Sequence, residues 1–134
     1  MKRAKLILLL MAVTLLIGAC DPAQRIVMRN KSDQTVYVSW IMEEDSVSNN
    51  KATQILKTST YTLGTQKKDK EETLYFGIGV WSDQAIDRFV DKVTSIEIVG
   101  VSTRVKMTDK ETIKKYFKAN RGGFMKSKLT VKVY

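Results

Sequence analysis

The sequence predicts an α+β fold, in which an antiparallel β-sheet of about five or six strands is covered by two short helices. Segments rich in β-branched and aromatic residues alternate along the chain with polar turns, which is typical of strands in a sheet. Two other segments, near residues 83–92 and 108–119, have apolar residues at helical spacing, and each begins at a residue that could cap a helix. A β-sandwich with helical insertions is the alternative fold for the same pattern.

The first strands are expected in the region that follows residue 24. Residues 25–30 and 35–42 are predicted to form a hairpin around a cluster of turn residues, and a weaker third strand is expected within 52–63. The polar segment between them, residues 43–51, is predicted to be an exposed loop. This part of the chain therefore supplies three of the expected strands.

Residues 73–81 form the most hydrophobic segment beyond residue 20, and we predict that they form a central strand. Gly77 and Gly79 lie two residues apart within it and so share one face. These glycines either allow a neighbouring element to pack closely or mark a β-bulge.

Both helices and the remaining strands are expected in the C-terminal half. Ser82 is placed to cap the first helix, and the T-x-x-E sequence that begins at Thr108 has the form of a capping box for the second. Residues 94–107 alternate as a long bent strand or a hairpin. Residues 127–134 show the most regular alternation in the chain and predict a closing strand.

The first 19 residues have the pattern of an export signal. A basic start with Lys2, Arg3 and Lys5 precedes an apolar run of 14 residues from Leu6 to Ala19. A membrane-spanning helix needs about 20 apolar residues, so this run is short for a permanent span. We therefore predict a cleaved signal peptide over residues 1–19.

The residues that end this run are Ile17, Gly18, Ala19 and Cys20, and all four positions resemble the lipobox of bacterial lipoproteins. The resemblance implies that a peptidase cuts between Ala19 and Cys20, that the Cys20 thiol receives a diacylglyceryl group, and that its amino group is acylated as well, as by palmitate. Each buried lipid CH₂ contributes about 0.8 kcal/mol, so two or three chains would anchor the protein stably in a bilayer. The alternative is that Cys20 is an ordinary thiol behind an ordinary signal peptide.

This resemblance also predicts the domain organisation and the location. Residues 1–19 would be the signal peptide, 20–24 a lipidated tether and 25–134 a single globular domain at the cell envelope. Asp21 directly after the lipidated cysteine resembles an inner-membrane retention signal of enterobacterial lipoproteins, whereas other lineages sort differently; the outer membrane is favoured and the inner membrane is the alternative. The layout also loosely resembles small lipoproteins of gut-type Gram-negative anaerobes, which implies no activity.

Composition limits the chemistry that the chain can perform. It has no histidine, which excludes histidine-based triads and histidine metal sites, and no metal or other cofactor is expected. Nucleophile motifs and phosphate-binding loops are absent. We therefore predict a non-catalytic binding or structural module rather than an enzyme. The alternative is a carboxylate-based hydrolase of envelope polymers, which needs two acids about 5–10 Å apart.

Charge supplies the last candidate site. Lysine and arginine number 23 against 14 acidic residues, and removal of the three basic residues in 1–19 leaves 20 against 14, a net charge of +6. Such a balance attracts anionic surfaces weakly, and a nucleic-acid partner is not expected at an envelope. The basic residues gather near the second helix, at Lys110, Lys114, Lys115, Lys118 and Arg121. This row could bind an anionic glycan, lipid or envelope protein, or it could be an ordinary solvated helix face.

The first helix carries a comparable acidic row. Asp83, Asp87 and Asp91 follow one another at i, i+4 and i+8 and share a face. Calcium loops wrap their ligands around a turn rather than placing them along a straight stripe. A solvated acidic face is therefore favoured over a metal site.

Overall fold

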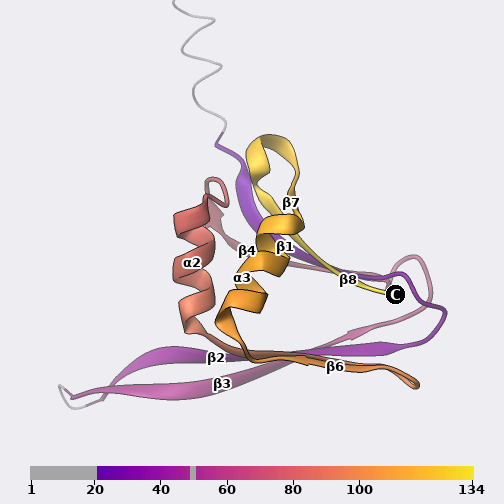
Figure 1. The fold of residues 1–134 in the computed structure, drawn as a ribbon, viewed down its shortest axis with the longest axis horizontal. Coiled ribbons are helices and arrows are strands. Elements are labelled where there is room, and N and C mark those ends of the chain that lie inside the picture. Colours follow the sequence, from indigo (N-terminus) through magenta and orange to yellow (C-terminus); the bar gives the residue numbers. More distant parts are fainter. Residues whose placement is uncertain (1–20, 49–50) are drawn as a thin grey trace, which may run out of the picture.

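The computed structural model describes residues 21–48 and 51–134, so the predicted signal peptide and lipobox lie outside the described residues. The α+β prediction is confirmed, because the described chain has two helices and eight strands in two four-stranded sheets. Figure 1 shows the sheets close together at the end where the C-terminus lies and apart at the other end, where both helices lie.

The first sheet contains both the first and the last strand of the chain. Its order is β4-β1-β8-β7. β1 pairs antiparallel with β4 and parallel with β8, which is the one parallel pair among the described strands. The bounds are Ala23–Asn30 for β1, Glu71–Ile78 for β4, Arg121–Gly122 for β7 and Lys128–Val133 for β8.

The second sheet is antiparallel throughout, in the order β3-β2-β5-β6. The segment 94–107 forms a hairpin in it rather than one bent strand. The bounds are Val36–Ser48 for β2, Lys51–Leu63 for β3, Val93–Val99 for β5 and Arg104–Met107 for β6.

The predicted hairpin of residues 25–30 and 35–42 is wrong, because β1 and β2 belong to different sheets. Asn30 at the end of β1 shows how the chain crosses between them. Its buried amide nitrogen donates hydrogen bonds to the carbonyl oxygens of Gln34, Leu63 and Gly64, and its side-chain oxygen accepts one from the Ser32 backbone N–H. These bonds fix a turn that joins the end of one sheet to the other.

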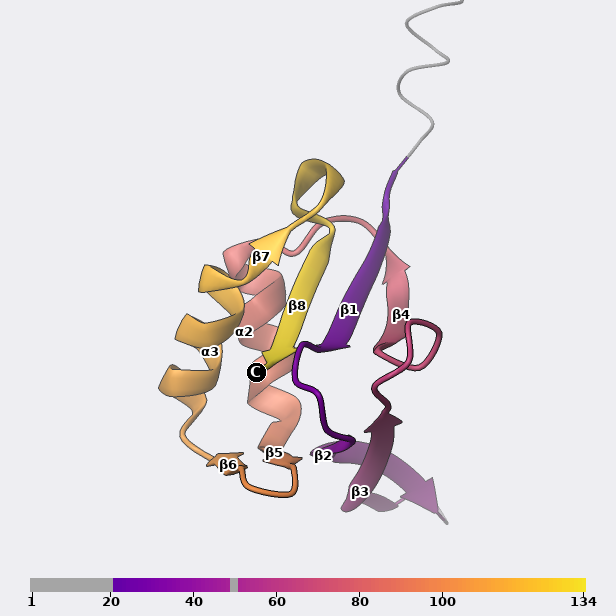
Figure 2. The ribbon, with the colours of Figure 1, turned by 90° about the vertical axis from the view of Figure 1, so that its right-hand side faces the viewer.

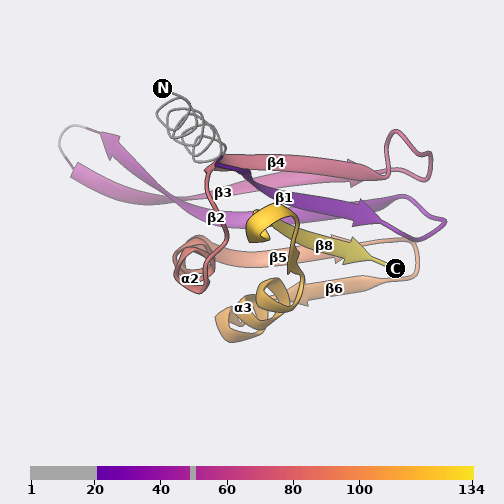
Figure 3. The ribbon, with the colours of Figure 1, turned by 90° about the horizontal axis from the view of Figure 1, so that it is seen from above.

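The predicted exposed loop over residues 43–51 is also wrong, because residues 43–48 and 51 belong to strands; residues 49–50 lie outside the described residues. β2 and β3 pair without interruption from Val36 and Leu63 to Ser48 and Lys51. A two-stranded ladder is held by backbone hydrogen bonds, which polar residues make as well as apolar ones do. The far end of this ribbon extends past the helices (Figures 1 and 3).

β4 lies at an edge of its sheet, which corrects the prediction of a central strand. The pairing of β4 with β1 shifts register between Gln24 and Arg25, opposite Gly77 and Tyr75, and Gly77 and Gly79 have φ values of +124° and +132°. A side chain added at either glycine would meet nothing within 4 Å. The glycines therefore belong to an irregular strand end, not to a close packing site.

The two helices agree with prediction in position. Helix α2 spans Asp83–Lys92, and Ser82 caps it by accepting a hydrogen bond from Ala85 N. Helix α3 spans Lys110–Ala119, but its cap is Asp109, which accepts from Thr112 N, and not the predicted Thr108. A short 3-10 turn, η1 at Phe124–Lys126, precedes β8.

The core lies between the sheets and is closed on one side by the helices (Figure 2). Its fully buried side chains come from β1, β2, β5, β8 and both helices, and from Leu63 at the end of β3. An aromatic cluster joins the layers, with Trp40 of β2 stacked on Phe117 of α3 at 5.9 Å and Phe89 of α2 in contact with both rings. The predicted closing strand is confirmed as β8, whose Leu129 and Val131 are fully buried.

Candidate functional site

The predicted basic row does not form a free cationic surface, because it faces the aspartate row of α2. Lys114 pairs with Asp91 at 3.6 Å, and Lys118 lies 3.4 Å from Asp87 and 3.9 Å from Asp83, so these pairs link α3 to α2. Arg121 of β7, just beyond α3, pairs with Asp83 at 2.6 Å. Lys110 donates a hydrogen bond to the backbone oxygen of Asp91. Lys115 takes part in no ion pair within the described part of the chain.

These contacts shift the pKa values of a residue in each row. The hydrogen bond from Arg121 holds the pKa of Asp83 below its usual value. For Lys114, burial lowers the pKa, but the carboxylates of Asp91 and Glu111 outweigh it and the net shift is upward. An anionic ligand at this row would have to compete with carboxylates that are already in place.

A cleft of about 450 Å³ lies between β4 and the β2–β3 ribbon, and it provides a better candidate site. Its volume falls in the range of small-ligand pockets. β3 and β4 run along the same long edge of the molecule, so the cleft opens between two sheet edges (Figure 3). The ribbon supplies Trp40, Met42, Glu43, Glu44, Asp45, Lys57, Ser59 and Tyr61, β4 supplies Thr73, Leu74, Tyr75 and Phe76, and α2 supplies Lys92.

The floor of the cleft follows from strand alternation. Trp40, Met42 and Glu44 occupy every second position of β2 and so point to one face. The register places Ser59 opposite Trp40 and Lys57 opposite Met42, on the same face of β3. The face is apolar near the core and becomes charged where the ribbon leaves it.

The charged rim consists of two ion pairs. Lys57 Nζ lies 2.9 Å from a carboxylate oxygen of Glu44, and Lys92 Nζ lies 3.6 Å from one of Asp45. Both pairs are more than half exposed, so they contribute little to stability. An aromatic and aliphatic interior with mixed charges at its mouth suits a ligand that has an apolar body and polar ends.

Sequence reasoning missed this cleft because its two walls are distant in the chain and come from different sheets. Trp40 is buried and forms part of the floor. Trp81, the other tryptophan, lies in the core, and its indole N–H donates to the Arg25 carbonyl oxygen at 3.0 Å. The hydrophobic segment that contains Tyr75 and Phe76 was the available signal, but the sequence does not show that these residues are exposed on an edge strand.

Residues 21–48 and 51–134 contain no group of three or more acidic or cysteine side chains that could hold a metal ion. Among the described helices, none combines the length and the apolar character that crossing a membrane requires. Comparison of the chain with protein-family models, curated proteins and solved structures finds no match.

Proposed function

We propose that this chain is a membrane-anchored lipoprotein of the cell envelope, and that its domain is a non-catalytic binding module. Anchoring rests on the lipobox at Ile17 to Cys20, with acylated Cys20 as the link to the bilayer. Binding rests on one observation, the apolar cleft between β4 and the β2–β3 ribbon. The ligand is a small molecule or a partner side chain with an apolar body and a polar end.

Intact mass measurement of the membrane fraction tests the anchor. A mature chain that begins at Cys20 and carries the mass of a diacylglyceryl group and a further acyl chain is expected. Cys20→Ala should remove the acyl mass without unfolding the domain, since all described elements lie beyond it. Density fractionation of the membranes then assigns the outer membrane, which we favour, or the inner one. An unacylated, soluble chain would refute the proposal.

An apolar fluorescent dye such as anilinonaphthalene sulfonate probes the cleft. Ser59→Trp should fill the space beside Trp40 and weaken dye binding, because Ser59 lies opposite Trp40 on the cleft face. Thr60→Trp is the matched control: it changes the next residue of the same strand, which is exposed on the other face. Equal binding by both variants would show that the dye does not occupy the cleft.

A carboxylate-based hydrolase of envelope polymers is the second candidate, because three consecutive acids border the cleft beside Trp40. Glu44 and Asp45 are each paired with a lysine, whereas Glu43 forms no ion pair within the described residues. Incubation with purified peptidoglycan or envelope glycan decides between the classes. Release of fragments that Glu43→Gln abolishes would establish the hydrolase; the binding module predicts no release by either protein.

A further inference from the structure

Backbone contacts hold the chain at Pro22 and Ala23, close to Cys20, where the proposed lipid anchor would be attached. Gly79 N donates a hydrogen bond to the Pro22 carbonyl oxygen at 2.8 Å, and Ala23 pairs with Ile78 as the first residue of β1. The boundary expected at residue 25 therefore lies inside a strand. Only Asp21 separates Pro22 from Cys20, so the Cα atoms of Pro22 and Cys20 are at most about 7.6 Å apart, two Cα–Cα steps.

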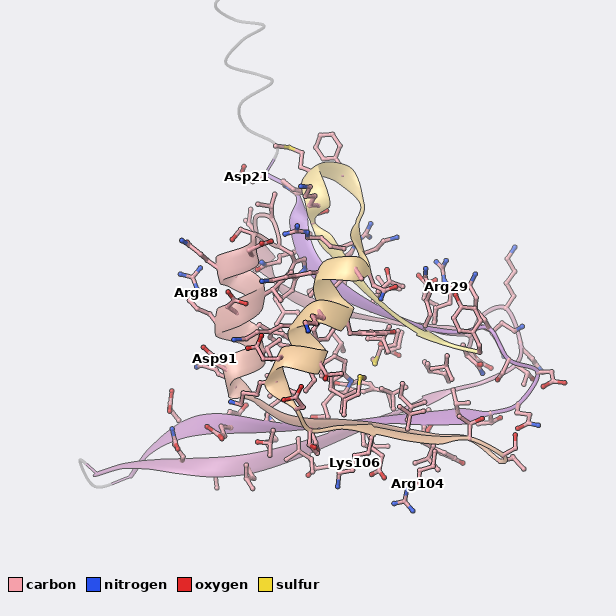
Figure 4. All side chains as sticks on the ribbon, viewed as in Figure 1. Asp21, Arg29, Arg88, Asp91, Arg104 and Lys106 are labelled. Carbon is pink, nitrogen blue, oxygen red and sulfur yellow. The ribbon has the colours of Figure 1, made fainter. Side chains whose placement is uncertain are left out.

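Four apolar side chains are exposed at this same end. Ile78 is 76% exposed, Phe124 71% and Met125 61%, and Val80 is also exposed. The Trp81 backbone N–H donates to the Lys126 carbonyl oxygen at 2.9 Å, which ties η1 to the end of β4 beside the Gly79–Pro22 bond. Figure 1 shows η1 next to the point where the chain enters the domain, and Figure 4 places Asp21 there. We call Ile78, Val80, Phe124, Met125 and Lys126 the anchor-end patch.

The backbone that presents this patch is strained. Met125 and Lys126 have φ values of 51° and 60°, a region that residues other than glycine rarely adopt, and they follow Gly123 at 77°. A side chain at Gly123 would come within 2.9 Å of the Lys128 Cβ. Such strain concentrates at functional sites. Here the strained turn leaves Phe124 and Met125 in contact with solvent, so burial within the described chain does not compensate for it.

We propose that the anchor-end patch lies in the surface of the bilayer that holds the lipid anchor. This inference rests on the proposed lipidation of Cys20. The polar layer on each side of a bilayer is about 5–8 Å thick, which matches the largest distance between Cys20 and Pro22. The apolar side chains then enter the boundary between headgroups and acyl chains, as those of interfacial helices do, and the exposed Lys126 meets lipid phosphates. A lipid surface is favoured over a protein partner because the anchor itself brings it to this patch.

The proposal fixes the orientation of the domain on the membrane. The turn between β5 and β6, which contains Val101, lies at the opposite end of the domain from η1 (Figure 1). Val101 is 84% exposed and therefore provides a matched control, being as accessible as the patch but directed away from the bilayer.

The test uses the full-length lipoprotein, isolated from membranes and reconstituted in vesicles of phosphatidylethanolamine and phosphatidylglycerol. Cysteines introduced as Phe124→Cys, Ile78→Cys or Val101→Cys are labelled with an environment-sensitive nitrobenzoxadiazole dye. Lipidation blocks the Cys20 thiol, so each protein carries one dye. We expect a blue-shifted emission, quenched by lipids with a nitroxide near the glycerol, at positions 124 and 78 but not at 101.

The two proposals fail in different ways. An intact mass without the acyl group would overturn the proposed function, and with it the patch. If Cys20 is acylated but the dye at position 124 or 78 emits as it does at 101, the patch alone is overturned. Circular dichroism of each labelled protein confirms that it is folded, and the two probe positions come from separate elements, β4 and η1.

Discussion

Asn30 makes five side-chain hydrogen bonds at the crossing between the sheets. It is 1% exposed, and its amide group is the donor to three carbonyl oxygens and the acceptor from two groups of Ser32. An amide is the one neutral side chain of this size that both donates twice and accepts. The sequence showed it only as one of several turn residues.

Asn30→Asp should destabilise the fold. The carboxylate has nearly the same shape but cannot donate, so it would face the oxygens of Gln34, Leu63 and Gly64 with no hydrogen between them. We expect the free energy of unfolding to fall by about 2–3 kcal/mol or more, measured by urea denaturation.

The matched control for this substitution is Asp33→Asn, the reverse change three residues away at an exposed position. It should alter the free energy of unfolding by less than about 0.5 kcal/mol. Equal effects of the two substitutions would show that the amide bonds of Asn30 do not hold the crossing.

The opposed charges of the helices could have been predicted from the sequence. Asp83, Asp87 and Asp91 repeat with the same spacing as Lys110, Lys114 and Lys118, and two helices with complementary rows can pair when they pack side by side. What the sequence could not show is that α2 and α3 are neighbours, because this is a matter of packing. The rows were therefore interpreted separately, the basic row as either an anion site or a solvated helix face and the acidic row as a solvated face.

At the scale of elements, patterns within one segment predicted the helices correctly, whereas the pairing of strands that are distant in the chain was not predicted. Both helices were predicted because their caps and apolar spacing are contained within about 12 residues. The partner of a strand is set elsewhere: β1 pairs with β4 and with β8, which lie far along the chain from it. The hydrophobicity of β4 suggested a buried centre, but those residues line the cleft and the anchor-end patch at a sheet edge.

Reversal of one ion pair tests the coupling of α2 and α3. Lys118→Glu places a carboxylate against Asp87 and should lower the free energy of unfolding by about 0.5–1 kcal/mol, since the pair is partly exposed. Adding Asp87→Lys should recover part of this loss, because the introduced glutamate would still face Asp83, whose carboxylate lies 3.9 Å from the Lys118 ammonium. The recovery should shrink at high salt. Strictly additive effects in urea denaturation would refute the coupling.

Two aspartate side chains, Asp83 and Asp109, should make the stability of the domain depend on pH in the acid range. Hydrogen bonds from Arg121 and from Thr112 lower the pKa of Asp83 and Asp109 respectively. A carboxyl group whose pKa is lower in the folded than in the unfolded state stabilises the fold at any pH above the unfolded pKa. This stabilisation is lost as the pH falls through the folded pKa.

Stability should therefore decrease as the pH falls below about 4, the unfolded value for aspartate. Asp109→Asn isolates the effect, because asparagine also caps helices but does not titrate. The urea concentration at the midpoint of unfolding is measured from neutral pH into this acid range. As the pH is lowered, it should fall less steeply in that variant than in the parent. Identical slopes would show that Asp109 does not contribute.

At the scale of the whole molecule, the described hydrophobic core uses no residue before Ile26. The described core lies between two sheets that share no strand, and the aromatic contacts of Phe89 in α2 with Trp40 of β2 and with Phe76 of β4 join them. The N-terminal boundary matters because β1 is an inner strand, paired on both sides. Loss of its first residues would remove bonds to β4 and to the Gly79 turn.

A chain of residues 22–134 should thus fold alone and show a circular dichroism spectrum of mixed sheet and helix. A chain of residues 25–134, cut at the boundary that the sequence suggested, should be less stable. It lacks the bond between Gly79 N and Pro22 O, the pairing of Ala23 and Gln24 with Ile78 and Gly77, and the bond from the Gln24 amide to the Val80 oxygen. Each lost hydrogen bond is expected to lower the free energy of unfolding by about 1 kcal/mol. Equal urea midpoints for the two chains would show that residues 22–24 are a tether after all, and a disordered spectrum for the longer chain would refute its independent folding.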